Sequence, residues 1–298
     1  MPALNYAEQY SNQLSQEFPY VLYFGALYNT PNNGRYRVVN ARTIEIPVLE
    51  TTGRVDSNRD TIATAKRNYN NQWEPKTLQN ERKWSTLVHP QDINQTNQVA
   101  SIANITRVYN EEQKFPEMDA YTVSKIYEEY TALGKAADTT ALTVENILSI
   151  FDKMMENMDE ARVPANGRVL YVTPTVNTLL KNAKEVARQI VLTNSASSVN
   201  RSLANLDQVE IEKVPSDLMK TVYDFTEGWK PGTAAKQINM LLIHPLAVIT
   251  PVNYEFVQLD PPSAGSEGKW VYFEESHEDV FILNKKVDAI QFNVEGGA

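Results

Sequence analysis

The chain contains no cysteine, and this absence removes several kinds of chemistry at once. Without thiols there is no disulfide framework, no thiolate nucleophile and no thiolate ligand for a metal. Histidine is scarce as well, since only His89, His244 and His277 are present. No two of them have the four-residue helical spacing of a zinc enzyme. The sequence therefore predicts neither catalytic nor metal-binding residues.

Motifs that bind phosphates or cofactors are also missing. There is no phosphate loop and no dinucleotide fingerprint, and residues 264–268 lack the strand-to-helix frame of a nucleophile elbow. The run His277-Glu278-Asp279 could hold a metal, but we interpret it as a turn between two strands. A carboxylate pair could still be present among the 37 acidic residues, so a hydrolytic, carbohydrate-active enzyme stays open as an alternative.

Long hydrophobic runs and an excess of basic residues are absent too. No window reaches the apolar length that crosses a bilayer, and no basic region followed by an apolar run marks the N-terminus as a secretory signal. The formal net charge of -9 argues against a dedicated nucleic-acid binder. With 42% hydrophobic and 22% charged residues, the composition predicts a globular intracellular chain.

The most informative feature that is present lies between residues 43 and 92. Residues 43–48 and 82–88 each alternate apolar and polar side chains, which predicts two half-buried strands. The polar segment between them, 53–80, is far longer than ordinary loops. A two-stranded ribbon is marginally stable on its own in water. We therefore predict an arm that projects from the body and is covered by another copy of the chain, which favours assembly over catalysis.

The middle of the chain has helical periodicity. Two apolar stripes predict a long helix over 97–134, broken or kinked near Pro116 and stopped at Gly134. A second helix is expected over 144–158 behind a Thr143 cap. Met154 lies off its apolar stripe, but with Met155 and Met158 it is interpreted as filling the core and not as a binding site. A buried strand at 168–172 then leads through Thr173-Pro174 into a third helix that reaches Ile190.

The second half is rich in strand patterns. We expect a strand at 209–214, a central strand at 238–244 and a loop at 227–232, followed by four late strands at 254–259, 270–274, 280–283 and 289–294. Residues 260–265, with two prolines and a glycine, are interpreted as a linker between the first two of these late strands. Together these elements predict an α+β fold.

The order of these parts resembles the major capsid proteins of tailed bacteriophages, which have the HK97-type shell fold. The resemblance rests on an N-terminal segment through Gly34, the ribbon, the long helix, the helix-strand-helix body and the strand-rich end. The segments 142–148 and 169–174 are the most similar in character. It implies five regions: an N-terminal arm (1–34), an extended β-ribbon loop with its base (35–96), a spine helix of a peripheral domain (97–141), an axial domain (142–260) and C-terminal strands that return to the peripheral domain (261–298).

The resemblance also implies a function. Copies would form pentamers and hexamers of an icosahedral shell around double-stranded DNA, which they would contact only non-specifically. A separate scaffolding protein and a portal are the implied partners, with no membrane and no cofactor. The protein would be part of the virion and would assemble in the host cytoplasm. A non-viral compartment protein of the same fold is a further alternative.

Seven residues are the candidate subunit contacts. Trp73 and Trp84 are candidate aromatic anchors of the ribbon, and Trp229 lies on a loop expected near the capsomer axis. The remaining four form a mixed-charge tip suited to ion pairs with a neighbour: Arg54, Asp56, Arg59 and Asp60. The alternatives are that Trp84 packs on its own body, that Trp229 packs under its own loop, and that the tip charges are simply solvated.

Overall fold

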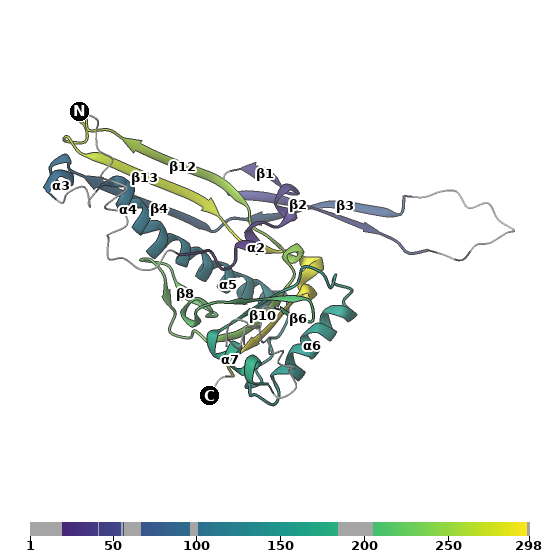
Figure 1. Cartoon of the computed structure of the whole chain (residues 1–298). Coiled ribbons are helices and arrows are strands. Elements are labelled where there is room, and N and C mark those ends of the chain that lie inside the picture. Colours follow the sequence, from purple (N-terminus) through teal and green to yellow (C-terminus); the bar gives the residue numbers. More distant parts are fainter. Residues whose placement is uncertain are drawn as a thin grey trace, which may run out of the picture.

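The computed structural model describes residues 20–40, 42–54, 56, 67–95, 101–183 and 205–296. The first nineteen residues of the expected N-terminal arm and the continuation of the third helix beyond 183 lie outside this part of the chain. Figure 1 shows a long sheet lying along a spine helix, a compact α/β body below them, and a narrow ribbon that extends away from both. In the described residues, the helices are all too short or too polar to traverse a membrane.

The spine helix contains an irregular turn next to its proline. It consists of α4 (Ile102–Tyr109), a π-helical turn (Asn110–Lys114) and α5 (Phe115–Ala132), preceded by the short helix α3 (Pro90–Gln95). Pro116 occupies the first turn of α5. Proline cannot donate to the helical ladder and its ring crowds the preceding turn, so the ladder widens before Pro116 and the helix continues. Gly134, in the left-handed region at φ 79°, follows the helix end as predicted.

The body is built on a five-stranded sheet with the order β15-β10-β5-β7-β6. Its strands are β5 (Val169–Val172), β6 (Asn205–Leu206), β7 (Val209–Lys213), β10 (Ile238–Ile243) and β15 (Ile290–Val294). β5 runs parallel to β7 and antiparallel to β10. The central strands predicted at 168–172 and 238–244 are confirmed, because they are almost wholly apolar and both of their faces are covered.

Alternate residues of the central strands face two different cores. Tyr171 and Leu241 pack in one cluster, which also includes Phe24 and residues of α5 such as Val123. Leu170, Met240 and their neighbours face the other way, against α6 (Ile147–Glu160) and α7 (Pro174–Asn182). The period-two direction of strand side chains thus places the sheet between the spine helix on one side and two shorter helices on the other.

The two shorter helices begin largely as their sequences predict. Thr173 accepts a hydrogen bond from the Val176 amide, and Pro174 occupies the first turn of α7. The start of α6 differs, because it is Asn146 that precedes the helix, while Thr143 and Asn146 exchange hydrogen bonds outside it. Met154 is buried, as expected of a residue that fills the core, because it continues the three- and four-residue spacing that runs from Ile147 to Met158.

The strand pairing around the ribbon differs from the prediction. The ribbon consists of β2 (Thr43–Thr51) and β3 (Tyr69–Thr77), with β1 (Arg37–Asn40) along the other edge of β2. The strand expected to be the ribbon's second half, β4 (Asn80–Val88), instead pairs with β13 (Trp270–Glu278) in a separate sheet of order β12-β13-β4. Alternation identified β4 as a strand but does not reveal its partner, and β3 was missed because it is almost entirely polar.

The predicted boundary at residue 260 cuts through this long sheet. Residues 260–265 lie in the hairpin that connects β12 (Val252–Asp260) to β13, so they link these two strands as expected. β15, which was assigned to the peripheral domain, instead pairs with β10 in the body. Proline and glycine mark a change of chain direction, which a hairpin and a domain linker share.

Short elements complete the described fold. They are α2 (Gly25–Tyr28), the 3-10 helices Pro31–Gly34, Ser216–Leu218, Pro245–Ala247 and Asn284–Ala289, and the two-residue strands β8 (Tyr223–Asp224), β9 (Lys230–Pro231), β11 (Val248–Ile249) and β14 (Phe281–Ile282). The segment before α2 is attached to the spine through Asp119, a buried residue of α5. Asp119 accepts hydrogen bonds from the Tyr20 hydroxyl at 2.5 Å and from the Tyr23 and Phe24 amides at 3.0 and 3.1 Å.

Candidate assembly surface

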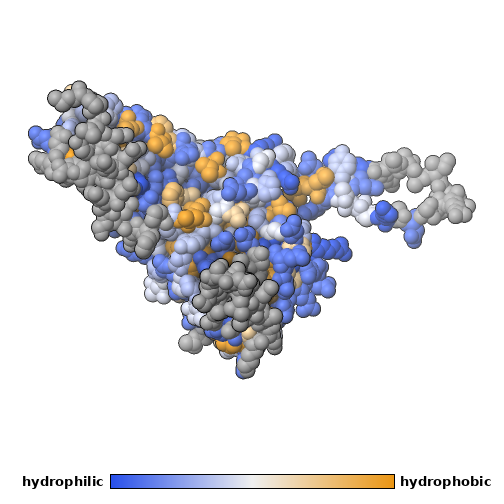
Figure 2. Space-filling view, viewed as in Figure 1, coloured by the Kyte–Doolittle hydropathy of each residue, from blue (hydrophilic) through white to orange (hydrophobic). Residues whose placement is uncertain are grey.

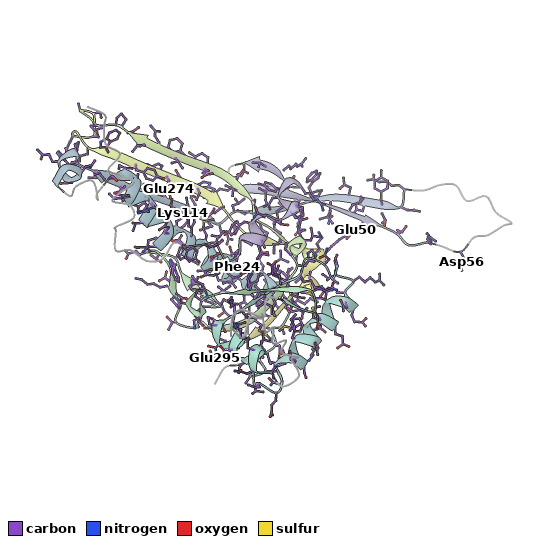
Figure 3. All side chains as sticks on the ribbon, viewed as in Figure 1. Phe24, Glu50, Asp56, Lys114, Glu274 and Glu295 are labelled. Carbon is purple, nitrogen blue, oxygen red and sulfur yellow. The ribbon has the colours of Figure 1, made fainter. Side chains whose placement is uncertain are left out.

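The ribbon has a buried root and an exposed outer part. At the root, Ile44, Ile46 and Leu78 pack against Ile249 and Phe281 of the body. Beyond Pro47 the pattern changes, and Leu49 is 62% exposed. Figure 3 places Glu50 beside the body and Asp56 far out along the projection. The outer ribbon therefore buries too little apolar surface to be stable as an isolated hairpin.

Polar contacts hold the root against the body's last 3-10 helix. Lys285 pairs with Glu50 at 2.9 Å, and this pairing lowers the pKa of the Glu50 carboxyl. On the other strand the Asn284 side-chain amide donates to Glu74. These contacts set the direction in which the ribbon leaves the body, although such exposed pairs contribute only about 0 to 1 kcal/mol each.

Trp73 lies on β3, on the part of the ribbon that leaves the body. Its side chain remains 39% exposed. The Arg37 guanidinium lies 4.0 Å from the centre of its ring and also pairs with Glu45 at 2.5 Å. A cation over an indole face orients the ring, so Trp73 is held in place yet still offers surface to a neighbour.

Trp84 does not lie on the ribbon. It belongs to β4, where its ring stacks on Tyr109 of the spine helix with ring centres 3.8 Å apart, and Tyr272 contacts it from β13. Within the subunit, Trp84 therefore packs on its own body, which was the alternative interpretation. The expectation that it anchors the ribbon was wrong because it rested on the incorrect pairing of β4.

Trp229 lies in the loop between β8 and β9. It is half-buried, packs against the main core and contacts the ring of Tyr223 at 6.2 Å. Within one chain, Trp229 thus packs under its own loop, which was the alternative interpretation. Its role between copies stays a prediction.

Of the four predicted tip charges, two are described. Arg54 and Asp56 are both exposed on the projecting part of the ribbon. Arg59 and Asp60 lie outside the described residues. The described pair is therefore accessible to a neighbouring chain, and its role in assembly stays a prediction.

Ion pairs connect the long sheet to the spine helix. Arg82 of β4 donates to both carboxylate oxygens of Glu117, at 2.6 and 3.0 Å, and Lys114 pairs with Glu274 of β13 at 3.3 Å. Burial raises the pKa of Glu117, although Arg82 opposes that shift. Figure 3 shows Lys114 and Glu274 side by side at this junction. Each of these two carboxylates already pairs with a cationic side chain across the junction between the sheet and the spine helix. They are therefore poor candidates for the two catalytic acids of a glycoside hydrolase.

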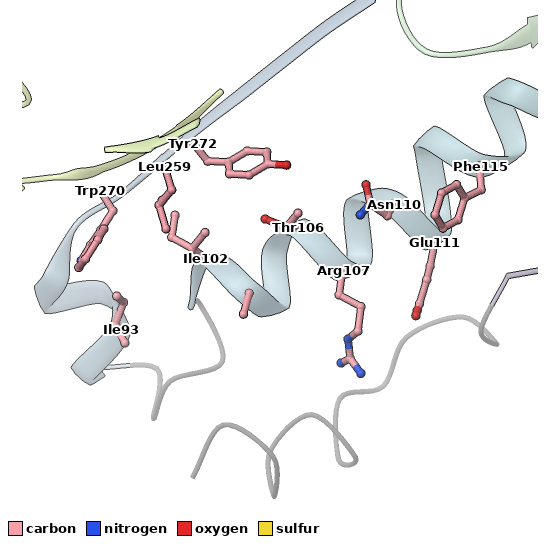
Figure 4. Close-up of a pocket in the computed structure, with 11 residues that line it drawn as sticks. Ile93, Ile102, Thr106, Arg107, Asn110, Glu111, Phe115, Leu259, Trp270 and Tyr272 are labelled. Carbon is pink, nitrogen blue, oxygen red and sulfur yellow. The ribbon is translucent and has the colours of Figure 1, made fainter. Parts of the chain in front are cut away.

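A hollow of about 740 Å³ lies between α3, α4 and the end of the long sheet. Figure 4 shows Ile93, Ile102, Leu259, Trp270 and Tyr272 around it. Among its described lining residues, Glu111 is the single carboxylate. The hollow thus lacks, in the described residues, the facing acids of a glycoside hydrolase.

Exposed apolar side chains on both faces of the edge strand β12 were not singled out from the sequence. Tyr254 and Phe256 are exposed on one face of the strand, and Val257 and Leu259 on the other. Figure 2 shows orange apolar surface along the upper sheet and again where the ribbon meets the body. The pattern in 254–259 predicts a strand but not that its faces are uncovered within one subunit. Contiguous exposed apolar surface is typical of protein contacts.

The interpretation of His277-Glu278-Asp279 as a turn was wrong. His277 and Glu278 are the last residues of β13, opposite Glu81 and Asn80 of β4. Asp279 is buried and accepts hydrogen bonds from the Gln79 amide at 2.7 Å and the Tyr121 hydroxyl at 2.8 Å. Acidic and polar residues resemble a turn in sequence, but here the neighbouring strand and the spine helix provide their partners.

Comparison with known proteins identifies the architecture. No family model matches the chain, and no curated protein matches its sequence. Solved structures do match: the mature capsid of bacteriophage PhiM1 is 13% identical with a TM-score of 0.68, and 96% of this chain covers 90% of that one. The capsid of the cyanophage P-SCSP1u gives 12% identity and a TM-score of 0.62, with coverage of 96% and 91%.

A third match comes from a different host group. A structure from Mycobacterium phage Che8 is 12% identical, with a TM-score of 0.59 and coverage of 94% and 93%. The similarity in all three extends over almost the whole chain while the sequences have diverged almost completely. The chain therefore has the α+β fold of the phage capsid structures, the HK97-type shell fold.

Proposed function

We propose that this chain is the major structural subunit of a bacteriophage shell. The observation that carries the proposal is the outer ribbon, a β2-β3 hairpin whose side chains are mostly exposed and which projects from a body with its own buried cores. The likeness of the whole chain to capsid structures supports the same function.

The two parts of the subunit have different roles in this proposal. The long sheet and the spine helix form the peripheral domain, and the five-stranded sheet with α6 and α7 forms the axial domain around which copies gather. The ribbon lies over a neighbour, with Trp73, Arg54 and Asp56 among its contacts, and Arg59 and Asp60 extend the tip. Trp229 lies on the axial side. Many modest contacts of this kind permit errors to be corrected, yet add up over a closed shell.

Further partners follow from the same proposal. Copies form pentamers and hexamers of an icosahedral shell around double-stranded DNA, with a separate scaffolding protein and a portal, in the cytoplasm of the host. The net charge of -9 supports contact with DNA that is weak and non-specific, because like charges repel. The subunit acts structurally and not as an enzyme.

Electron microscopy combined with a single introduced thiol tests the proposal. Because the chain has no cysteine, Asp56→Cys places one reactive thiol on the ribbon. We expect closed particles by negative stain when the protein is produced with its neighbouring genes, and slow labelling of this thiol in particles compared with free subunits. Glu160→Cys, at the exposed end of α6, is the matched surface control. A discrete monomer or dimer under all these conditions would refute the function, and particles with a rapidly labelled ribbon would refute the ribbon's role.

A further inference from the structure

Three potential metal ligands converge at the end of the long sheet nearest the ribbon. His277 and Glu81 are direct partners in the β13-β4 ladder, and Glu275 lies two residues before His277 on the same strand. Side chains two apart on a strand project from the same face, so all three share one face of the sheet. Their ligand atoms all lie within 4.8 Å of one another.

The imidazole of His277 makes no hydrogen bond within the described part of the chain. Its side chain is 12% exposed, and both ring nitrogens are buried without a hydrogen bond. Tyr254 of β12 packs against the ring with centres 5.4 Å apart, which restricts its movement. A buried ring nitrogen without a hydrogen bond is destabilising, and a cation held between the imidazole and the two carboxylates would give it a partner.

The two distances from His277 to the carboxylates are close to those between ligand atoms around a small coordinated ion. His277 Nε2 lies 3.2 Å from an oxygen of Glu81 and 3.7 Å from an oxygen of Glu275. Ligand atoms placed about 2.0 to 2.2 Å from a tetrahedral zinc are roughly 3.3 to 3.6 Å apart. One imidazole with two carboxylates suits zinc better than calcium or magnesium, which prefer oxygen ligands throughout.

The surrounding cations tune this site without blocking it. Arg42 pairs with the second oxygen of Glu81, at 2.5 Å, and leaves the first oxygen facing His277. Lys83 is opposite Glu275 in the ladder. The Arg42 contact orients the Glu81 carboxylate, in the way that residues behind metal ligands usually do, while its charge weakens the attraction for a cation.

We propose that Glu81, Glu275 and His277 form a zinc site in which each residue donates one ligand atom and water completes the coordination. The ion joins β4 to β13 only a few residues after the ribbon ends at Thr77. It therefore reinforces the edge of the sheet from which the ribbon departs. The proposal concerns a single chain and does not depend on shell formation.

Zinc binding to the purified, unassembled subunit tests this directly. Isothermal titration at neutral pH, after removal of metal by a chelator, is expected to show one zinc per chain. His277→Gln and Glu275→Gln should each weaken binding at least about tenfold, because each removes a ligand. Glu210→Gln, an exposed glutamate on β7 of the other sheet, should leave the affinity unchanged. Circular dichroism confirms that each variant is folded.

Two further measurements separate this site from adventitious surface binding. Cobalt in place of zinc should give visible absorption bands that His277→Gln abolishes. Arg42→Ala should tighten zinc binding, because it removes the competing charge while leaving all three ligands. Absence of zinc binding by the folded subunit, or binding that His277→Gln and Glu210→Gln affect equally, would overturn the proposal, whether or not the protein forms shells.

Discussion

The ribbon and the five-stranded sheet are both made of β-strands, but they are stabilised in opposite ways. In β5 and β10 nearly every side chain is buried, with α5 on one face and α6 and α7 on the other. In β3 the side chains are mostly exposed, and β2 is buried only at its root. Backbone pairing alone does not distinguish the two regions, because both have regular ladders. The two regions differ in whether other parts of the same chain bury the faces of the strands.

This difference assigns different tasks to the two regions. A sheet covered on both faces is stabilised by its own chain and persists in the isolated subunit. An uncovered hairpin is marginal in water and gains stability when another surface covers it. Changes in the sheet should therefore affect folding first, whereas changes in the outer ribbon should affect assembly first.

Shortening the ribbon should produce the largest effect. Replacing residues 51–69 with Asn-Gly joins Glu50 to Asn70, which are partners in the ladder, through a favourable two-residue turn. We expect particle formation to be lost, while the free energy of unfolding of the subunit changes by less than about 1 kcal/mol. Electron microscopy and urea unfolding measure the two quantities. Normal particles from this variant would remove the basis for treating the ribbon as an assembly element.

A matched pair of leucine substitutions compares the two regions directly. Leu241→Ala in β10 removes a fully buried side chain and should destabilise the subunit by about 2 to 5 kcal/mol. Leu49→Ala on the ribbon, where the side chain is 62% exposed, should change subunit stability by no more than about 0.5 kcal/mol. Urea unfolding of the free subunit gives both values. Equal losses would show that the outer ribbon is part of the subunit's own core.

The attachment of residues 20–24 to the spine should depend on pH. Burial raises the pKa of Asp119 from 3.8 to about 6, although its three hydrogen bonds oppose the shift. The folded state therefore binds this proton more tightly than the unfolded state does. The resulting stabilisation is complete below about pH 4 and is lost as the pH rises through about 6.

Asp119→Asn removes this titration and provides the test. The stability difference between wild type and variant should shift in favour of the variant between pH 4 and pH 6 and then stay constant up to pH 8. Urea unfolding across this range measures it. Asp224→Asn is the control, because Asp224 is exposed and its pKa is lowered by hydrogen bonds from Thr226. A difference between wild type and Asp119→Asn that does not vary with pH would contradict the prediction.

A small effect is expected at the ribbon's cation over Trp73. Arg37→Ala removes the guanidinium above the ring and the pairing with Glu45, and should lower subunit stability by about 0.5 to 1 kcal/mol. Arg37→Lys keeps the charge but not the planar stacking, and should restore only part of the loss. Tryptophan fluorescence together with urea unfolding reports on both variants. A loss above about 2 kcal/mol would place this contact among the core interactions.

Much of the candidate surface could be predicted, but not its partners. The exposed segment around Arg54 and Asp56 followed from polar composition, which is a local property. Trp84 was placed on the ribbon because its strand alternates, although its ring stacks on Tyr109 of the spine helix. The proposed zinc site around His277 was not predicted, because Glu81 is almost two hundred residues away in the sequence and only the strand register brings the two residues together.

The sequence by itself determined the elements whose cause is local. The helix start at Thr173-Pro174, the helix stop at Gly134 and the buried strands β5 and β10 follow from caps, backbone freedom and continuous apolar composition. Only the tertiary structure decided that β3 pairs with β2, that β4 joins β12 and β13, and that the spine continues through Pro116 by a π turn. The physical reason is that a strand's pattern records how many of its faces are buried, whereas its partner depends on contacts between residues far apart in the chain.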